Sequence, residues 1–331
     1  MLFDQFPRVL DASGAVTLTG AERNELDALA NCLATTASRE MDSVDWIRAA
    51  RALSCEAPCR LRVILRHFRR DSGSDGFLLL HGLPVCEERL PATPVMAESV
   101  QRFSSHPASM LALVGLQLGE LVAYREEKSG ALVQDVVPVP GMESSQSNSG
   151  STELELHVEN AFHPNRPDFV CLLCLRPDHD RVAGLRIAAC RRAVDRLTER
   201  TRRVLHQPRF VTTPPASFGD RVIAAIPHAI LDGCPDDPDL RVDFASTQPS
   251  DEEAARAMIE LRKALLDVQT TLVLEAGDLA VVDNRTAVHG RTAFRPRYDN
   301  GDRWLQRAYI HADIRRSRRV RPADGHVVHG M

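Results

Sequence analysis

Two histidines and one glutamate are spaced so that they could hold a metal ion. His157 and Glu159 are separated by one residue, and His289 follows 130 residues after Glu159. Side chains at positions i and i+2 of a strand point to the same face, so the first two can reach one ion together. Two imidazoles and one carboxylate suit Fe(II) and leave the opposite coordination face open for a cosubstrate and O2. The chain has 12 histidines and 45 acidic residues, so chance pairs are expected and the neighbouring sequence has to support the assignment.

Longer motifs surround these positions. They are Gly130-Ala-Leu-Val-Gln-Asp-Val-Val-Pro-Val-Pro140, Leu156-His-Val-Glu-Asn-Ala-Phe-His163, Arg166-Pro-Asp-Phe-Val170, Asp236-Asp-Pro-Asp-Leu-Arg-Val-Asp243, Gly277-Asp-Leu-Ala-Val-Val-Asp-Asn284, Val288-His-Gly-Arg291, Pro296-Arg-Tyr-Asp-Asn-Gly-Asp-Arg303-Trp-Leu-Gln-Arg307 and Arg321-Pro-Ala-Asp-Gly325. With them, roughly residues 70–325 resemble the clavaminate synthase-like branch of the Fe(II)/2-oxoglutarate-dependent dioxygenases. The resemblance implies a mainly β fold with flanking helices and a double-stranded β-helix (jelly-roll) core.

The resemblance also implies roles for five side chains. His157, Glu159 and His289 would be the iron ligands. Arg303 lies fourteen residues after His289, where the branch places the arginine that binds the distal carboxylate of 2-oxoglutarate. A guanidinium fork matches a carboxylate through two parallel hydrogen bonds. Arg307, four residues further along the same strand face, would contact the carboxylate of an amino-acid substrate.

Four further positions carry over as amino-acid recognition residues. Glu127 and Gln134 can accept hydrogen bonds from an α-ammonium group, and Asn148 offers both a donor and an acceptor. Asp243 accepts only when ionised, so it favours an amide NH2 or a cation. Arginine hydroxylases of the branch carry a second acidic residue two positions later, where this chain has Ala245. One carboxylate suits a short amide better than a long cation.

The expected activity is therefore hydroxylation of a free L-amino acid at C3, with Fe(II), 2-oxoglutarate and O2 and with release of succinate and CO2. L-Asparagine is the expected substrate. Arginine, lysine, a cyclic arginine derivative and a carrier-tethered amino acid remain alternatives. A non-catalytic jelly-roll binding protein and a zinc hydrolase with the same ligands are two further readings. The resemblance also suggests a link to a nonribosomal peptide synthetase pathway.

The composition of the chain indicates a globular protein and gives no sign of a nucleic-acid-binding or membrane protein. The chain has 331 residues, is 44% hydrophobic, and carries a net charge of −4, which gives no sign of nucleic-acid or acidic-membrane binding. No apolar stretch reaches 18 residues, and Met1-Leu-Phe-Asp-Gln-Phe lacks the pattern of a signal peptide. Cys171-Leu-Leu-Cys174 has CxxC spacing, but it lies within the apolar run 169–175 and no second CxxC exists, which favours a strand core. Reduced thiols in a cytoplasmic protein fit best.

We expect a single catalytic domain over residues 1–331, with a helical part of about 1–120 packed on a jelly-roll core of about 121–325. Thr19-x-x-Glu22 predicts a capping box that opens a helix to about Thr35. The other helices are predicted at Asp45–Leu53, at Glu98–Leu118 with an interruption at Pro107, and at Asp251–Val268 with Ser250 as N-cap.

Short apolar runs predict the strands. These are Phe77–Leu80, Val133–Val139, Leu154–Glu159, Phe169–Leu175, Leu185–Ala189, Leu240–Phe244, Leu279–Val282 and Trp304–Ile310. Two segments, Ala123–Gly130 and Thr212–Ile223, are predicted as loops that close over the site.

Overall fold

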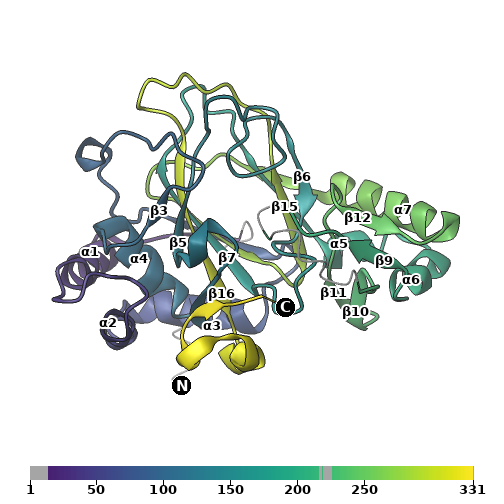
Figure 1. Cartoon of the computed structure of the whole chain (residues 1–331), viewed down its shortest axis with the longest axis horizontal. Coiled ribbons are helices and arrows are strands. Elements are labelled where there is room, and N and C mark those ends of the chain that lie inside the picture. The colour runs from purple at the N-terminus through teal and green to yellow at the C-terminus, as the bar shows by residue number, and fades with distance from the viewer. Residues whose placement is uncertain (1–13, 216–217, 219–225, 331) are drawn as a thin grey trace.

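Two facing β-sheets form the centre of the structure, a computed structural model that describes residues 14–215, 218 and 226–330 (Figure 1). The larger sheet has the strand order β1 (Ala15–Thr17), β2 (Phe77–His81), β14 (Leu279–Asp283), β7 (Phe169–Arg176), β16 (Trp304–His311), β4 (Glu120–Tyr124) and β17 (Val327–Val328), with β5 (Val133–Val136) paired to β16 and β3 (Val100–Gln101) paired to β5. The smaller sheet has the order β13 (Thr270–Leu272), β8 (Leu185–Ala189), β15 (Ala287–Arg291) and β6 (Leu154–His157).

Strand β7, in the middle of the larger sheet, is formed by an uninterrupted run of apolar residues. Its residues are buried on both faces, because Phe169, Cys171 and Leu173 pack against helices, whereas Val170 and Leu172 pack toward the smaller sheet. A strand covered on both faces needs apolar side chains at every position. Cys171 and Cys174 therefore point in opposite directions, and burial raises the pKa of each thiol to about 12. The prediction that this CxxC is strand core is confirmed.

Helices cover the outer faces of the two sheets. The larger sheet is covered by α1 (Gly20–Ala34), α2 (Val44–Ser54), α3 (Cys59–Arg70) and α4 (His106–Gly115). The smaller sheet is covered by α5 (Cys190–Val194), α6 (Glu199–Leu205) and α7 (Glu252–Val268), together with the hairpin of β10 (Leu231–Cys234) and β11 (Asp237–Leu240) and the pair of β9 (Phe210–Thr212) and β12 (Thr247–Pro249). In Figure 1 the two helical groups lie on opposite sides of the strands. The expected jelly-roll core with flanking helices is confirmed.

Two of the predicted helix starts can be compared with the structure. Thr19 accepts a hydrogen bond from the backbone N–H of Glu22, and the Glu22 carboxylate accepts one from the N–H of Thr19, so the capping box is confirmed. The N-cap of α7 is Asp251 and not Ser250. The Asp251 carboxylate accepts from two backbone N–H groups of the first turn, whereas the Ser250 hydroxyl donates to Asp251. An ionised carboxylate can accept both bonds, which a hydroxyl at the preceding position cannot reach.

The prediction of one helix over Glu98–Leu118 is wrong. Residues 100–101 form β3, and α4 begins only at His106. Pro107 lies in the first turn of α4, where its missing N–H breaks no intrahelical hydrogen bond, so it begins a helix instead of interrupting one.

The predicted strand Leu240–Phe244 is confirmed only in part, because Leu240 ends β11 and Asp243 forms a single antiparallel bridge with His157 of β6. Asp243 closes a turn there, since its backbone carbonyl accepts from the N–H of Thr247 and its carboxylate accepts from the N–H of Ala245. Helix α3 was not predicted, although its buried residues Leu61, Ile64, Leu65 and Phe68 have the spacing of one apolar helix face.

The first predicted loop begins inside β4, and the structure continues it as a short 3-10 turn, Lys128–Gly130. Of the second, residues 216–217 and 219–223 lie outside the described residues, as do residues 1–6, which were considered for a signal peptide. Among the helices that the structure describes, none is long and apolar enough to cross a membrane.

Candidate active site

The pairing of β6 with β15 brings the three predicted metal ligands together. His157 and His289 are opposite partners in this antiparallel pair, and their ring centroids lie 4.6 Å apart. Glu159 follows β6, and its Oε1 lies 3.5 Å from Nε2 of His289. One ligand atom from each residue lies within 4.8 Å of the others. A strand register between segments 130 residues apart therefore assembles the set.

Hydrogen bonds around the set fix its orientation. His157 Nδ1 lies 2.8 Å from the carbonyl oxygen of Glu155, which leaves Nε2 of that ring free for a metal. The fully buried Asn284 accepts from the backbone N–H of Glu159 at 2.7 Å and donates to its carbonyl oxygen at 3.2 Å. Asn284 closes a motif quoted above, but its contact with Glu159 could not be read from sequence because the two lie 125 positions apart.

The ionisation states also suit a metal. Burial alone would raise the pKa of Glu159, but the Arg307 guanidinium and His289 lower it well below its ordinary value, so the carboxylate is charged. Burial lowers the pKa of His289, which favours the neutral imidazole. A charged carboxylate beside a neutral imidazole is the form in which these side chains bind a divalent cation.

Arg307 on β16 joins most of the residues predicted to recognise an amino acid. Its guanidinium donates to Oε1 of Glu159 at 2.7 Å, to Oε1 of Gln134 at 2.5 Å, and to Glu127. With the amide oxygen of Asn148 turned toward it, Arg307 Nη1 also donates to that oxygen at 2.8 Å. Burial would lower the pKa of Arg307, but the surrounding Glu159, Tyr309 and Glu127 raise it above its ordinary value. The cation is therefore permanent.

Tyr309 is a neighbour of the set that sequence reasoning missed. Its hydroxyl lies 2.9 Å from Oε1 of Glu127 and 3.0 Å from Oε2 of Glu159, and its ring lies under the Arg307 guanidinium at 4.5 Å. Burial raises the pKa of Tyr309 well above its ordinary value, so the phenol keeps its proton and can donate. The signal in the sequence was its position two residues after Arg307, hence on the same strand face.

A cavity of ≈ 520 Å³ opens in front of these residues. His157 and Glu159 lie in its wall together with Glu127, Asn148 and Asp243. The Asp243 carboxylate is held by its turn, with Oδ1 accepting from the Ala245 N–H at 2.9 Å and Oδ2 from the Ser246 hydroxyl at 2.6 Å. Each oxygen accepts one described bond, so lone pairs remain for a ligand.

Arg303 is placed apart from this cluster, immediately before β16. It is buried, and among the described residues no carboxylate forms an ion pair with it. Arg291 approaches it, since both guanidinium carbons lie over the ring of Phe294, at 5.4 Å for Arg291 and 5.7 Å for Arg303. Burial and then the charge of Arg303 lower the pKa of Arg291 to about 9. Two buried cations that have no ion-pair partner among the described residues are unfavourable until an anion binds beside them.

The described residues therefore fit the groups that the sequence implies. The nitrogen and oxygen donors match a divalent iron ion, and the buried, unpaired Arg303 matches a dicarboxylate cosubstrate. Arg291 joins it as a residue that sequence reasoning did not assign, although its position two residues after His289 placed it on the same strand face.

Residues 46–309 match the family described as "Taurine catabolism dioxygenase TauD, TfdA family". This match covers more than half of the chain. The chain belongs to this family. Two of its relatives are L-asparagine oxygenase of Streptomyces coelicolor, 50% identical with 95% of this chain and 94% of the relative covered, and clavaminate synthase 2 of Streptomyces clavuligerus, 35% identical with 88% and 90% covered. The resemblance to the clavaminate synthase-like branch is thereby confirmed.

Two solved structures agree with the fold. Asparagine oxygenase in complex with Fe(II), 2S,3S-3-hydroxyasparagine and succinate matches with a TM-score of 0.93 and 49% identity, covering 96% of this chain and 99% of the other. The non-heme iron oxygenase OrfP in complex with Fe and alpha-ketoglutaric acid matches with a TM-score of 0.86 and 28% identity, covering 95% and 99%.

Proposed function

We propose that this chain is an Fe(II)- and 2-oxoglutarate-dependent dioxygenase that hydroxylates free L-asparagine at C3, releasing succinate and CO2. The observation that carries the proposal is the hydrogen bond from Arg307 to Glu159, one of the three proposed metal ligands, beside a cavity lined by His157, Glu159 and Asp243. We further propose that residues 1–331 act as one catalytic domain, in the cytoplasm, where the eight free cysteines stay reduced.

His157, Glu159 and His289 would hold the iron. Bound Fe(II) supplies the activation of O2 and the oxidising power that breaks the C–H bond, with 2-oxoglutarate as the source of electrons. The side chains of the protein hold the metal ligands, the cosubstrate and the amino acid in position. Tyr309 and Asn284 hold Glu159 so that its carboxylate keeps one orientation when the ion binds.

Arg303 would bind the distal carboxylate of 2-oxoglutarate, with Arg291 adding a second positive charge beside it. A buried guanidinium pair attracts a dianion more strongly than a monoanion, because it lacks a competing carboxylate and is shielded from water. This fixes the cosubstrate at the end of the site away from Arg307.

The amino acid would bind in front of Arg307 without touching the iron. Its carboxylate is expected to join the Arg307 guanidinium, and its α-ammonium group would donate to Glu127 and Gln134. The side-chain amide would donate to Asp243 and exchange hydrogen bonds with Asn148. Two fixed ends leave C3 as the position that faces the metal, and orientation of this kind accounts for much of the selectivity of such enzymes.

The side chains at positions 243 and 245 favour asparagine over a basic substrate. Asp243 is the carboxylate there, and Ala245 stands where a second one would be needed to hold a guanidinium. The proposed product would serve as a building block in nonribosomal peptide or other secondary-metabolite assembly, in line with the clavaminate synthase relative.

A panel of free amino acids tests the proposal. Fe(II)-reconstituted protein is incubated with 2-oxoglutarate, O2 and each of L-asparagine, L-glutamine, L-arginine, L-ornithine, L-lysine and L-aspartate, and succinate is measured. Asparagine should give the largest substrate-dependent release. Preference for lysine or arginine would keep the reaction and change the substrate, and activity that needs neither 2-oxoglutarate nor O2 would indicate a zinc hydrolase instead.

A further inference from the structure

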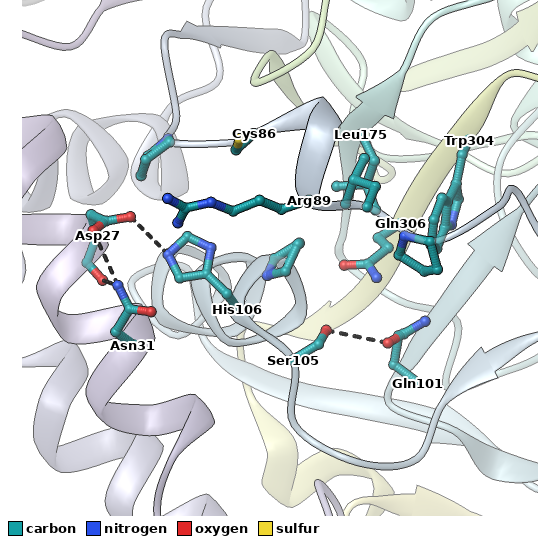
Figure 2. Close-up of a pocket in the computed structure, with 14 residues that line it drawn as sticks. Asp27, Asn31, Cys86, Arg89, Gln101, Ser105, His106, Leu175, Trp304 and Gln306 are labelled. Atoms are coloured by element: carbon teal, nitrogen blue, oxygen red, sulfur yellow. Dashed lines mark hydrogen bonds and ion pairs between the residues drawn. The ribbon is translucent and has the colours of Figure 1, made fainter. Parts of the chain in front are cut away.

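A second cavity lies behind β16, on the face of the larger sheet opposite the site described above. It measures ≈ 450 Å³ and lies between α1, α4 and the segment that leads into a short 3-10 helix, Glu87–Arg89 (Figure 2). Trp304 and Gln306 reach it from β16. Alternate residues of that strand, Leu305 and Tyr309, pack on the other side, toward the smaller sheet. The two cavities share no lining residue in the described chain.

The inner end of this cavity holds a polar group without a partner. Gln306 is 1% exposed, and its Oε1 is buried with no hydrogen-bond partner. Figure 2 shows the amide of Gln306 directed into the cavity, beside Leu175 and Trp304. The indole N–H of Trp304 already donates to Asp135 at 2.8 Å, so the ring contributes an apolar surface only. An amide left unpaired in an apolar setting is the natural partner of a ligand amide or hydroxyl.

The opposite end carries an unpaired positive charge. Arg89 has no ion pair or side-chain hydrogen bond among the described residues, and Figure 2 shows its guanidinium extending over the cavity toward His106. The one carboxylate in this wall, Asp27, is already engaged. It lies 2.9 Å from His106 Nε2 and accepts from Asn31 at 3.1 Å. Arg89 is therefore the charged side chain of this wall that has no partner among the described residues, and its guanidinium can pair with an anion.

We infer that this cavity binds a small carboxylic acid with an apolar body and an amide or hydroxyl group at its far end. The carboxylate would pair with Arg89, the body would lie on Leu175 and Trp304, and the polar end would satisfy Gln306. The ligand would rest on the back of β16, whose front carries Arg307. The inference concerns a second site and does not rest on the proposed function.

The test uses 4-carbamoylbenzoate, a flat ring with a carboxylate at one end and an amide at the other. Binding to the full chain is followed by calorimetry, with saturating 2-oxoglutarate present to fill the active site. Benzoate lacks the amide, and terephthalamide lacks the charge. The inference predicts that 4-carbamoylbenzoate binds more tightly than either.

Three variants locate the probe. Arg89→Gln should weaken 4-carbamoylbenzoate by about tenfold or more, because it removes a charge-assisted hydrogen bond, and leave terephthalamide unchanged. Gln306→Leu should reduce its affinity to that of benzoate. Arg66→Gln, an exposed arginine of α3, is the matched control and should change nothing.

Three results would overturn the inference. They are the absence of binding at millimolar 4-carbamoylbenzoate, displacement of the probe by 2-oxoglutarate, and equal affinity in the wild type and in Arg89→Gln. The Arg89 variant changes only an exposed side chain, so it stays informative if Gln306→Leu fails to fold.

Discussion

Arg307 Nη1 donates a hydrogen bond to Oε1 of Glu159 at 2.7 Å, and both side chains are buried. One of these residues belongs to the proposed iron site and the other to the proposed amino-acid site. The contact means that the carboxylate is ionised before any metal arrives, because the guanidinium lowers its pKa. It also means that the two sites share one network of charges, which includes Glu127.

Removing Arg307 should destabilise the metal-free protein. Arg307→Met leaves the carboxylates of Glu127 and Glu159 without their cation, and breaking a buried ion pair costs about 3–5 kcal/mol. Urea denaturation of both proteins measures the difference in the free energy of unfolding. Arg48→Met, which breaks the exposed pair with Asp45, should cost less than about 1 kcal/mol. Equal losses in the two variants would mean that the Arg307 network carries no net stability.

Removing a histidine of the iron set should abolish metal binding. His157→Ala and His289→Ala are each expected to lose Fe(II) binding and turnover while keeping the β-core. Wild type should show a higher melting temperature with Fe(II) than without it, because an ion that binds only the folded state stabilises that state. This shift should vanish in both variants and persist in the control His67→Ala, an exposed histidine of α3. Unchanged turnover in either site variant would remove the metal assignment.

Arg303→Lys should act on the cosubstrate alone. Replacing a bidentate fork by a point charge loses one charge-assisted hydrogen bond, about 1.5–3 kcal/mol, so KM for 2-oxoglutarate should rise roughly 10- to 100-fold. KM for the amino acid should stay near the wild-type value. Arg291→Gln should act in the same direction with a smaller effect. If Arg303→Lys changed only the amino-acid KM, Arg303 would have to be reassigned to the substrate.

The sequence predicted the metal set and the jelly roll because both rest on local or motif-level signals. His157 and Glu159 share a strand face, and a strand such as Phe169–Leu175 can be predicted from its uninterrupted apolar run. It could not predict that Arg307 contacts Glu159, because that contact depends on β16 lying beside β5 and β7 in the sheet. The same holds for Tyr309 and Asn284, whose partners are far away along the chain.

The predictions of secondary structure were wrong where one residue type can occupy two different structural positions. Pro107 can interrupt a helix or begin one, and only the strand β3 before it decides between the two. Residues 240–244 alternate apolar and charged side chains, which favours a strand, but beyond Leu240 only Asp243 pairs, with His157, and its carboxylate then closes a turn by accepting backbone and hydroxyl hydrogen bonds. A short polar side chain competing with the ladder in this way leaves little periodic signal.

Stability should fall as the solution is acidified below neutral pH. Burial lowers the pKa of His163 and of His311 to about 4, below the ordinary value of 6.5. The unfolded chain therefore binds protons that the folded chain does not, so stability is complete above pH 6.5 and declines as the pH falls toward 4. Each histidine contributes roughly 1 kcal/mol per pH unit in this window.

Denaturation of wild type and His311→Gln at several pH values checks this linkage. The variant should show a shallower decline between pH 6.5 and 4, since one of the buried histidines that titrate there is gone. An identical slope in both proteins would show that His311 is not held neutral in the folded state.

Asp243 should exclude L-aspartate. Two unit negative charges about 4 Å apart repel by about 4 kcal/mol at an effective dielectric near 20, which is roughly a thousandfold in affinity. Asp243→Asn removes the charge and supplies a donor at nearly constant volume. The variant should form 3-hydroxyaspartate and use L-asparagine less well, with iron and 2-oxoglutarate binding unchanged. Asp232→Asn, an exposed aspartate of β10, serves as the matched control. A variant that gains no aspartate activity would show that Asp243 does not read the side chain.

The most direct test of the account is the product formed from L-asparagine. Protein loaded anaerobically with Fe(II) and 2-oxoglutarate is mixed with L-asparagine and O2, and succinate and hydroxylated amino acid are quantified by mass spectrometry. The account predicts 3-hydroxyasparagine and succinate in equal amounts, with the oxygen atom of the new hydroxyl derived from labelled O2. Succinate without hydroxylated asparagine, or hydroxylation at another carbon, would contradict it.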